Sequence, residues 1–203
     1  MLIIEHSSSS YAPRTYHNAG TADLTVAFAI DFNTAGERLT QKAAKEKYVA
    51  VPLSMDPIVA ARRLYKACKH HNVKKLNVAG NGIYSLVKKG WTQESLNQWV
   101  FDVISLVHKH WPLQSIISGG QTGVDLAGGV VGEVLGIETV MTLPNGYLQR
   151  NAEGVDITQS VDDVIENVMS YVELHHQKRP FSRSFYLFYN SDFVRITYSI
   201  PIE

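Results

Sequence analysis

Residues Ser115-Ile116-Ile117-Ser118-Gly119-Gly120-Gln121-Thr122-Gly123-Val124-Asp125-Leu126-Ala127 decide the fold class of this chain. A short apolar run ends in two glycines, and polar residues and a helix-like pattern follow, which predicts a strand, a tight turn and a helix N-terminus. Glycines let backbone N–H groups approach a ligand closely, and the start of a helix favours a phosphate. The spacing of Thr122 and Asp125 predicts a capping box. The alternative is a plain strand-to-helix turn that needs glycine for its geometry alone.

The composition bounds the class of protein. The chain has 203 residues, with 19 basic and 19 acidic side chains, so no bulk charge attracts nucleic acid or a membrane surface. A hydrophobic content of 45% fits an ordinary globular core. Cys68 is the single cysteine, which excludes an internal disulfide and favours a reducing compartment. We therefore expect a cytoplasmic protein with neither a membrane nor a nucleic-acid partner.

Apolar runs and helical periodicities alternate along the chain. Strands are expected near residues 2–4, 22–30, 48–53, 75–80, 115–118 and 137–141, and helices near 11–18, 35–46, 56–69, 92–110, 124–135 and 160–174. On the helix near 56–69, we expect Val59, Leu64, Ala67 and Cys68 to face inward. This alternation predicts an α/β fold with a mostly parallel sheet and helices on both faces. Residues 1–155 would form this domain, and residues 156–203 would add a helix and a β-hairpin.

Three polar or glycine-rich turns, at 31–37, 80–84 and 118–125, follow predicted strands. Because parallel sheets bind ligands beyond the carboxyl ends of their strands, these turns supply the candidate site residues. The candidates are Asp31, Asn33, Thr34, Gly80, Asn81, Tyr84, Gly119, Gly120, Gln121, Thr122, Gly123 and Asp125. Tyr84 could instead be a core residue and Asp125 a helix cap. The eight histidines show no ligand spacing, so no bound metal is expected.

A family resemblance follows from these motifs. The segment 118–125 resembles the Gly-rich motif of the molybdenum-cofactor carrier family of the SLOG superfamily, which also holds the lonely-guy phosphoribohydrolases and the DprA-like proteins. The N-terminal segment with Glu5, Tyr11, Arg14-Thr15 and Asn18 resembles the later half of that carrier family. Here residues 1–53 resemble the second half and residues 74–150 the first, so the resemblance implies a circularly permuted Rossmann-like domain.

The lonely-guy enzymes offer a comparison that bears on chemistry. Their pattern places a catalytic Arg on Arg14, a Thr on Thr34 and a catalytic Glu on Glu37, while their first glycines are missing at 29–31 and Asn33 replaces the next. The resemblance implies that Glu37 stabilises a sugar cation or activates water. Arg14 would hold a phosphate or orient the carboxylate, and Thr34 with the backbone of 119–123 would hold the phosphate.

Other roles follow from the same comparison, each with a structural alternative. Asp31 would meet ribose hydroxyls, and Asn81 and Tyr84 would face the base. The alternative for Glu37 is a position favoured by the helix dipole alone. The alternative for Arg14 is a surface ion pair with Glu5 or Asp23, worth about 0–1 kcal/mol.

Three functions remain open from the sequence. The first is nucleotide binding with hydrolysis of the N-glycosidic bond, as in a phosphoribohydrolase. The second is a non-catalytic sensor or sequestering protein for a nucleotide-derived signal, and the third is a molybdenum-cofactor carrier. Apolar rows in the hairpin near 185–200 favour a homodimer or a higher homo-oligomer.

Overall fold

The computed structural model describes residues 1–178, 184–189 and 192–197. Its centre is a six-stranded sheet in the order β1-β6-β5-β4-β2-β3, and every pairing in it is parallel. The strands are β1 (Leu2–Glu5), β2 (Leu24–Ala29), β3 (Tyr48–Pro52), β4 (Lys75–Gly80), β5 (Ser115–Ser118) and β6 (Glu138–Leu143). The predicted α/β class with a parallel sheet is confirmed, and all six predicted strands are present.

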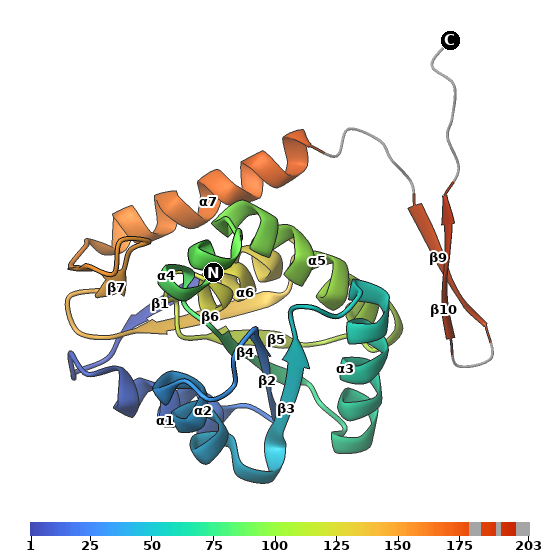
Figure 1. Ribbon diagram of the computed structural model, residues 1–203, viewed down its shortest axis with the longest axis horizontal. Coiled ribbons are helices and arrows are strands. Elements are labelled where there is room, and N and C mark those ends of the chain that lie inside the picture. The colour runs from blue at the N-terminus through green and yellow to red at the C-terminus, as the bar shows by residue number, and fades with distance from the viewer. Residues whose placement is uncertain (179–183, 190–191, 198–203) are drawn as a thin grey trace.

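Helices cover both faces of the sheet (Figure 1). α1 (Tyr11–Thr21) and α2 (Ala35–Ala44) pack together on one face, and α3 (Pro57–His71), α5 (Gln93–His110) and α6 (Val124–Val134) pack side by side on the other. The main core fills the second interface, where Leu64, Ile104 and Ile116 are fully buried. α7 (Val161–Gln177) packs on α6 over a smaller cluster around Met141 and Leu143.

The strand order places a crevice between β2 and β4. From β2 the chain passes through α2 to β3 at the edge, and it then returns through α3 to β4 on the other side of β2. Because the two connecting helices lie on opposite faces, the loops that leave the carboxyl ends of β2 and β4 diverge there. This reversal is the position at which open α/β sheets bind ligands.

The first crossover of the chain supplies one wall of that crevice. β1 is an edge strand paired only with β6, whereas the next strand, β2, lies four positions away in the sheet. α1 therefore crosses one face of the sheet, in contact with β6 and β4. Its N-terminal turn lies at the carboxyl edge, where it lines the cavity described below. Residues from the start of the chain thus meet residues from its middle, as the circular permutation implies.

The C-terminal segment agrees with its sequence pattern. Ser160 and Asp163 form a capping box at the start of α7, which extends to Gln177. β9 (Ser184–Tyr189) and β10 (Asp192–Thr197) pair antiparallel, as expected for a hairpin. Its turn lies outside the described residues, and so do the side chains on which the expected dimer contact depends. Among the described residues no helix is long and apolar enough to cross a membrane.

Two local expectations are wrong. Thr122 and Asp125 form no capping box, because Gly123 with φ of 103° is the N-cap residue of α6 and makes no side-chain cap. Val59 is 48% exposed on the outer face of α3, whereas Leu64 and Cys68 are buried as expected. The short strands β7 (Gln149–Arg150) and β8 (Asp156–Ile157), and the single-turn helix α4 (Ile83–Leu86), were not expected from the sequence.

Candidate functional site

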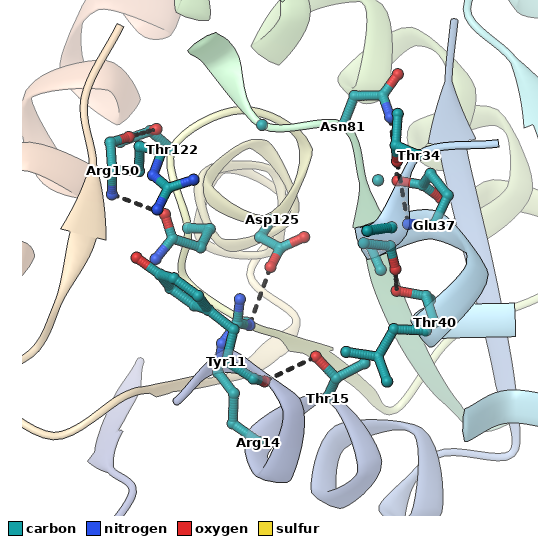
Figure 2. A pocket seen from close by; sticks show the side chains of 18 of the residues that line it. Tyr11, Arg14, Thr15, Thr34, Glu37, Thr40, Asn81, Thr122, Asp125 and Arg150 are labelled. Atoms are coloured by element: carbon teal, nitrogen blue, oxygen red, sulfur yellow. Dashed lines mark hydrogen bonds and ion pairs between the residues drawn. The ribbon is translucent and has the colours of Figure 1, made fainter. Parts of the chain in front are cut away.

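A cavity of about 560 Å³ lies at the carboxyl ends of β2, β4 and β5. All three predicted turns contribute to it, together with the first turns of α1 and the side chain of Arg150. Figure 2 shows Arg150 and Thr122 on one side, Thr34, Glu37 and Asn81 on the opposite side, and Asp125 between them. The volume is in the range of cavities that hold small-molecule ligands and cofactors.

Arg14 and Asp125 form an ion pair in the wall of the cavity. The Nη1 atom of Arg14 lies 3.0 Å from Oδ2 of Asp125, and both side chains are at least nine-tenths buried. Burial raises the pKa of Asp125 above its usual range, against the opposing effect of the Arg14 guanidinium. The alternative of a surface pair between Arg14 and Glu5 or Asp23 is therefore wrong. Asp125 is a member of this pair and caps nothing.

Gly119 is the residue that lets this ion pair fit. A Cβ atom at position 119 would overlap the guanidinium of Arg14 and the carboxylate of Asp125. The absence of a side chain therefore serves the close approach of Arg14 to the strand end. Arg14, the turn after β5 and the turn after β2 share one cavity, as the resemblance requires.

Glu37 lies in the first turn of α2 and is 2% exposed. Burial, and then the nearby charges of Asp125 and Asp31, raise its pKa to about 8, although a hydrogen bond from Asn81 opposes the shift. The Nδ2 of Asn81 donates to Oε1 of Glu37 over 3.2 Å, and Oε2 has no partner. A pKa of about 8 favours the protonated form of Glu37 at neutral pH, and one oxygen of this carboxyl group has no partner in the cavity wall.

Four buried polar atoms without a hydrogen-bond partner belong to residues that line this cavity. They are Nε of Arg14, Oδ1 of Asn18, Oε2 of Glu37 and Oδ1 of Asn77. The amide nitrogen of Asn18 donates to the Ser118 carbonyl over 3.0 Å, which fixes its oxygen as the free acceptor. A buried polar group left unpaired costs about 1–3 kcal/mol. A polar ligand that entered the cavity could recover this cost.

The turn of residues 119–123, here called the glycine turn, uses its own N–H groups inside the protein. Gly120 donates to Oγ of Ser118 over 3.2 Å, and Gly123 donates to Oε1 of Gln93 over 2.6 Å. Gln93 also donates to the Gly123 carbonyl over 2.8 Å, so one side-chain amide holds both backbone groups of this glycine. Neither Gly120 nor Gly123 lines the cavity. The structure thus gives the N–H groups of these two glycines hydrogen-bond partners within the protein.

The side chains of the glycine turn hold β7. Gln121 donates to the Leu148 carbonyl and accepts from the Arg150 N–H, each over 2.9 Å. The hydroxyl of Thr122 donates to the Arg150 carbonyl. Both residues line the cavity, but these polar groups are already engaged by protein partners.

The remaining predicted residues divide into two groups. Thr34 lines the cavity and caps α2, because its Oγ1 accepts from the Glu37 N–H over 3.2 Å. Gly80, Asn81 and Tyr84 also line it, and the 38% exposed Tyr84 is a rim residue and not a core residue. Asp31 and Asn33 are exposed, do not line the cavity and bond each other, since Oδ1 of Asp31 accepts from the Asn33 N–H.

Several residues with no predicted site role line the cavity or hold the glycine turn beside it. They are Tyr11, Asn18, Asn77 and Arg150 in the lining, and Gln93 at the turn. Tyr11 and Asn18 stood in the family resemblance, which was the one available signal for them. The described residues contain no group of three or more histidine, cysteine, aspartate or glutamate side chains that could hold a metal ion.

Comparison with known families gives one match. Residues 2–85 match the model of the circularly permutated YpsA SLOG family, which is less than half of the chain. This match supports the SLOG superfamily and the circular permutation, both expected from the motifs. The comparisons with curated proteins and with solved structures found no match.

Proposed function

We propose that the cavity binds a nucleotide or a nucleotide-derived ligand and that Glu37 acts in the hydrolysis of its N-glycosidic bond. The observation that carries the proposal is the buried Glu37 carboxyl group, which has one unpaired oxygen in a cavity whose other unpaired atoms belong to Arg14, Asn18 and Asn77. Its pKa, raised to about 8 by burial, supports a role as a proton donor. Perturbed carboxylates in clefts are common at catalytic sites. The match to a SLOG family agrees with a nucleotide-related ligand.

Two helix N-termini at the cavity favour an anionic ligand. α1 begins after Ser10 and α2 after Thr34, and the first residues of each line the cavity. The first N–H groups of a helix have no partner within the helix, and they lie at the positive end of its dipole. Together they supply a positive field for a phosphate without requiring an excess of basic side chains.

The depth of the cavity suggests how the ligand would lie. Asn77 is three residues before the end of β4, which places it about 10 Å below the carboxyl edge of the sheet. Glu37 and Asp125 lie in the first turns of α2 and α6, which begin at that edge, and the 47% exposed side chain of Arg150 is assigned to the mouth. A nucleotide with its base between α1 and α2 would place its sugar beside the two carboxyl groups and its phosphate at the mouth.

In that pose the residues divide the chemistry between them. Glu37 donates its proton to the departing base as the bond between C1′ and the base nitrogen breaks. The Asp125 carboxyl group, which is paired with Arg14, stabilises the positive charge that develops on the sugar. Water then attacks C1′ and returns a proton to Glu37. The products are the free base and the sugar phosphate.

The test is incubation with the four ribonucleoside 5′-monophosphates, with the free base measured by chromatography. We expect base release to fall by roughly 10²–10⁴-fold in Glu37→Gln while nucleotide binding remains. Glu46→Gln, which changes an exposed carboxylate beyond the end of α2, is the matched control and should keep full activity. Absence of nucleotide binding by the unmodified protein would overturn the proposal.

A sensor or sequestering protein is the second candidate. Asp31 and Asn33, where the lonely-guy pattern has glycines, form a local turn, and Gly120 and Gly123 have no free N–H for a phosphate. Tight binding of an intact nucleotide without base release would favour this function. Co-purified pterin or molybdenum would instead favour the carrier function.

A further inference from the structure

We infer that Arg150 anchors the ligand phosphate, and that the glycine turn acts on this phosphate through Arg150 and not through its own N–H groups. The inference rests on the proposed function, because it concerns the same cavity. It assigns a specificity-determining residue that lies outside the segment matched by the family.

The backbone of Arg150 is fixed to the glycine turn at both of its polar groups. Its N–H donates to Oε1 of Gln121, and its carbonyl accepts from the hydroxyl of Thr122. Gln121 also holds the carbonyl two residues earlier, at Leu148. The side chains of Gln121 and Thr122 therefore fix the position of Arg150. This gives a reason for glutamine and threonine between the glycines.

The side chain of Arg150 is oriented by contacts on the outer side of the cavity mouth. Its Nε and Nη2 atoms donate to the two carboxylate oxygens of Asp156 over 2.8 and 3.0 Å. The hydroxyl of Tyr11 donates to the same carboxylate over 2.9 Å, and the guanidinium carbon of Arg150 lies 5.8 Å from the Tyr11 ring centroid. These contacts leave the Nη1 amino group available to the cavity that Arg150 lines.

The two arginines of the cavity differ in exposure. The arginine, aspartate and glutamate residues that line the cavity are Arg14, Glu37, Asp125 and Arg150. Arg14 is 6% exposed and its Nη1 is bound to Asp125, whereas the side chain of Arg150 is 47% exposed at the mouth. A phosphate that stayed partly solvated at the mouth would meet Arg150 first. It would also lie close to the N-terminus of α1, which begins at Tyr11.

The consequence is selection of phosphorylated ligands over the corresponding nucleosides. A hydrogen bond between guanidinium and phosphate is charge-assisted, and an oriented arginine loses little side-chain entropy when it binds. Net values of about 1.5–3 kcal/mol for such bonds correspond to roughly 10–100-fold in affinity. Arg150 should therefore affect nucleotides strongly and nucleosides hardly at all.

The experiment compares each of the four ribonucleoside 5′-monophosphates with its own nucleoside by calorimetry. The measured quantity is the dissociation constant of the nucleoside divided by that of the nucleotide. We expect Arg150→Gln to lower this ratio about 10–100-fold with nucleoside affinity unchanged, and Arg150→Lys to restore part of it. Arg38→Gln, which removes an exposed cation of α2 outside the cavity, is the matched control and should leave the ratio unchanged.

Gln121→Ala tests the role of the turn. It should lower the ratio although Arg150 is present, and the double variant Gln121→Ala/Arg150→Gln should be no worse than Arg150→Gln alone. Thermal unfolding curves verify that each variant is folded. If the unmodified protein prefers nucleotides and Arg150→Gln keeps that preference, this inference is overturned while the proposed function stands. If the unmodified protein binds no nucleotide, both are overturned.

Discussion

The two strand-to-helix turns beside the cavity, β2–α2 and β5–α6, differ in how completely their polar side chains are bonded within the protein. In the β5–α6 turn, Gly120, Gln121, Thr122 and Gly123 all bond to protein partners. In the β2–α2 turn, Glu37 is buried with one carboxyl oxygen unbonded. The glycine-rich β5–α6 turn, whose sequence is the more distinctive, has its polar groups bonded within the protein. The β2–α2 turn, whose sequence is the less distinctive, holds Glu37, the group that is costly to bury.

Packing explains this difference. Gly119 and Gly123 are required because Arg14 and the backbone of the β4–α4 loop approach too closely for a Cβ atom. A glycine cluster therefore marks close approach of chain segments, and a ligand contact is only one cause of close approach. A buried acid that has no cationic partner in the fold is a more direct indication of function, because its burial destabilises the protein.

The largest expected effect concerns the pH dependence of stability. Glu37 ionises near pH 4.5 in the unfolded chain and near pH 8 in the folded protein. Between these values the folded state holds a proton that the unfolded state has lost, so the free energy of unfolding should fall as pH rises from about 4.5 to 8. At about 1.4 kcal/mol per pKa unit, the total fall is on the order of 5 kcal/mol.

Urea unfolding of the unmodified protein and of Glu37→Gln across this pH range measures the effect. The variant carries no titrating group at position 37, so its curve should be flatter, and it should be the more stable of the two at pH 8. Parallel curves would show that Glu37 ionises normally in the folded protein, and the contrast between the two turns would then be lost.

The second effect concerns the buried ion pair between Arg14 and Asp125, in which Asp125 belongs to the start of α6. Asp125→Ala leaves the Arg14 guanidinium buried without its partner, which should cost about 3–5 kcal/mol of unfolding free energy. Replacing both residues, as Arg14→Met/Asp125→Ala, removes the unpaired charge and should recover more than half of that loss. A cost below 1 kcal/mol for the single variant would mean that water reaches Arg14.

The third effect compares one glycine from each turn. Gly119→Ala places a methyl group on the Arg14–Asp125 pair and should cost about 2–3 kcal/mol. Gly36→Ala, in the first turn of α2, meets no atom within 4 Å and should be neutral or stabilise by about 0.5–1 kcal/mol. Neither glycine has a positive φ, so thermal unfolding of the two variants separates close packing from backbone strain. Equal costs would contradict the packing argument.

The smallest effect concerns the support of the glycine turn. Gln93→Ala removes both hydrogen bonds to Gly123 and should lower stability by about 1–2 kcal/mol. Gln98→Ala, on the same helix, loses one contact to Asp102 four residues on and should cost no more than about 0.5 kcal/mol. Denaturant midpoints distinguish the two. Equal midpoints would show that the turn holds its shape without Gln93.

The elements of the sheet could be predicted because their signals are local. The continuous apolar run of β2 is buried at every position, and Ser160 begins α7 with a capping box, as the spacing of Ser160 and Asp163 indicates. The same spacing failed at Thr122. There the hydroxyl bonds to the carbonyl of Arg150 in β7, which is a tertiary competitor that no local pattern contains.

The location of the candidate site could be predicted from the sequence, but the contacts within the site could not. The three turns indicated the correct edge of the sheet, and the resemblance indicated Arg14 and Glu37. The partner of Arg14 was missed because Asp125 lies 111 residues along the chain, whereas the alternatives considered were near in sequence. The raised pKa of Glu37 depends on burial by other elements, so its own segment gave no sign of it.

The wide separation of Arg14 and Asp125 has a consequence for biosynthesis. A ribosome that adds roughly 5–20 residues per second needs about 6–22 s to make the 111 residues that separate the two. During that interval the guanidinium has no counterion from the later segment and must stay hydrated. The wall of the cavity that α1 supplies therefore closes late in synthesis, after β5 and the start of α6 have left the exit tunnel.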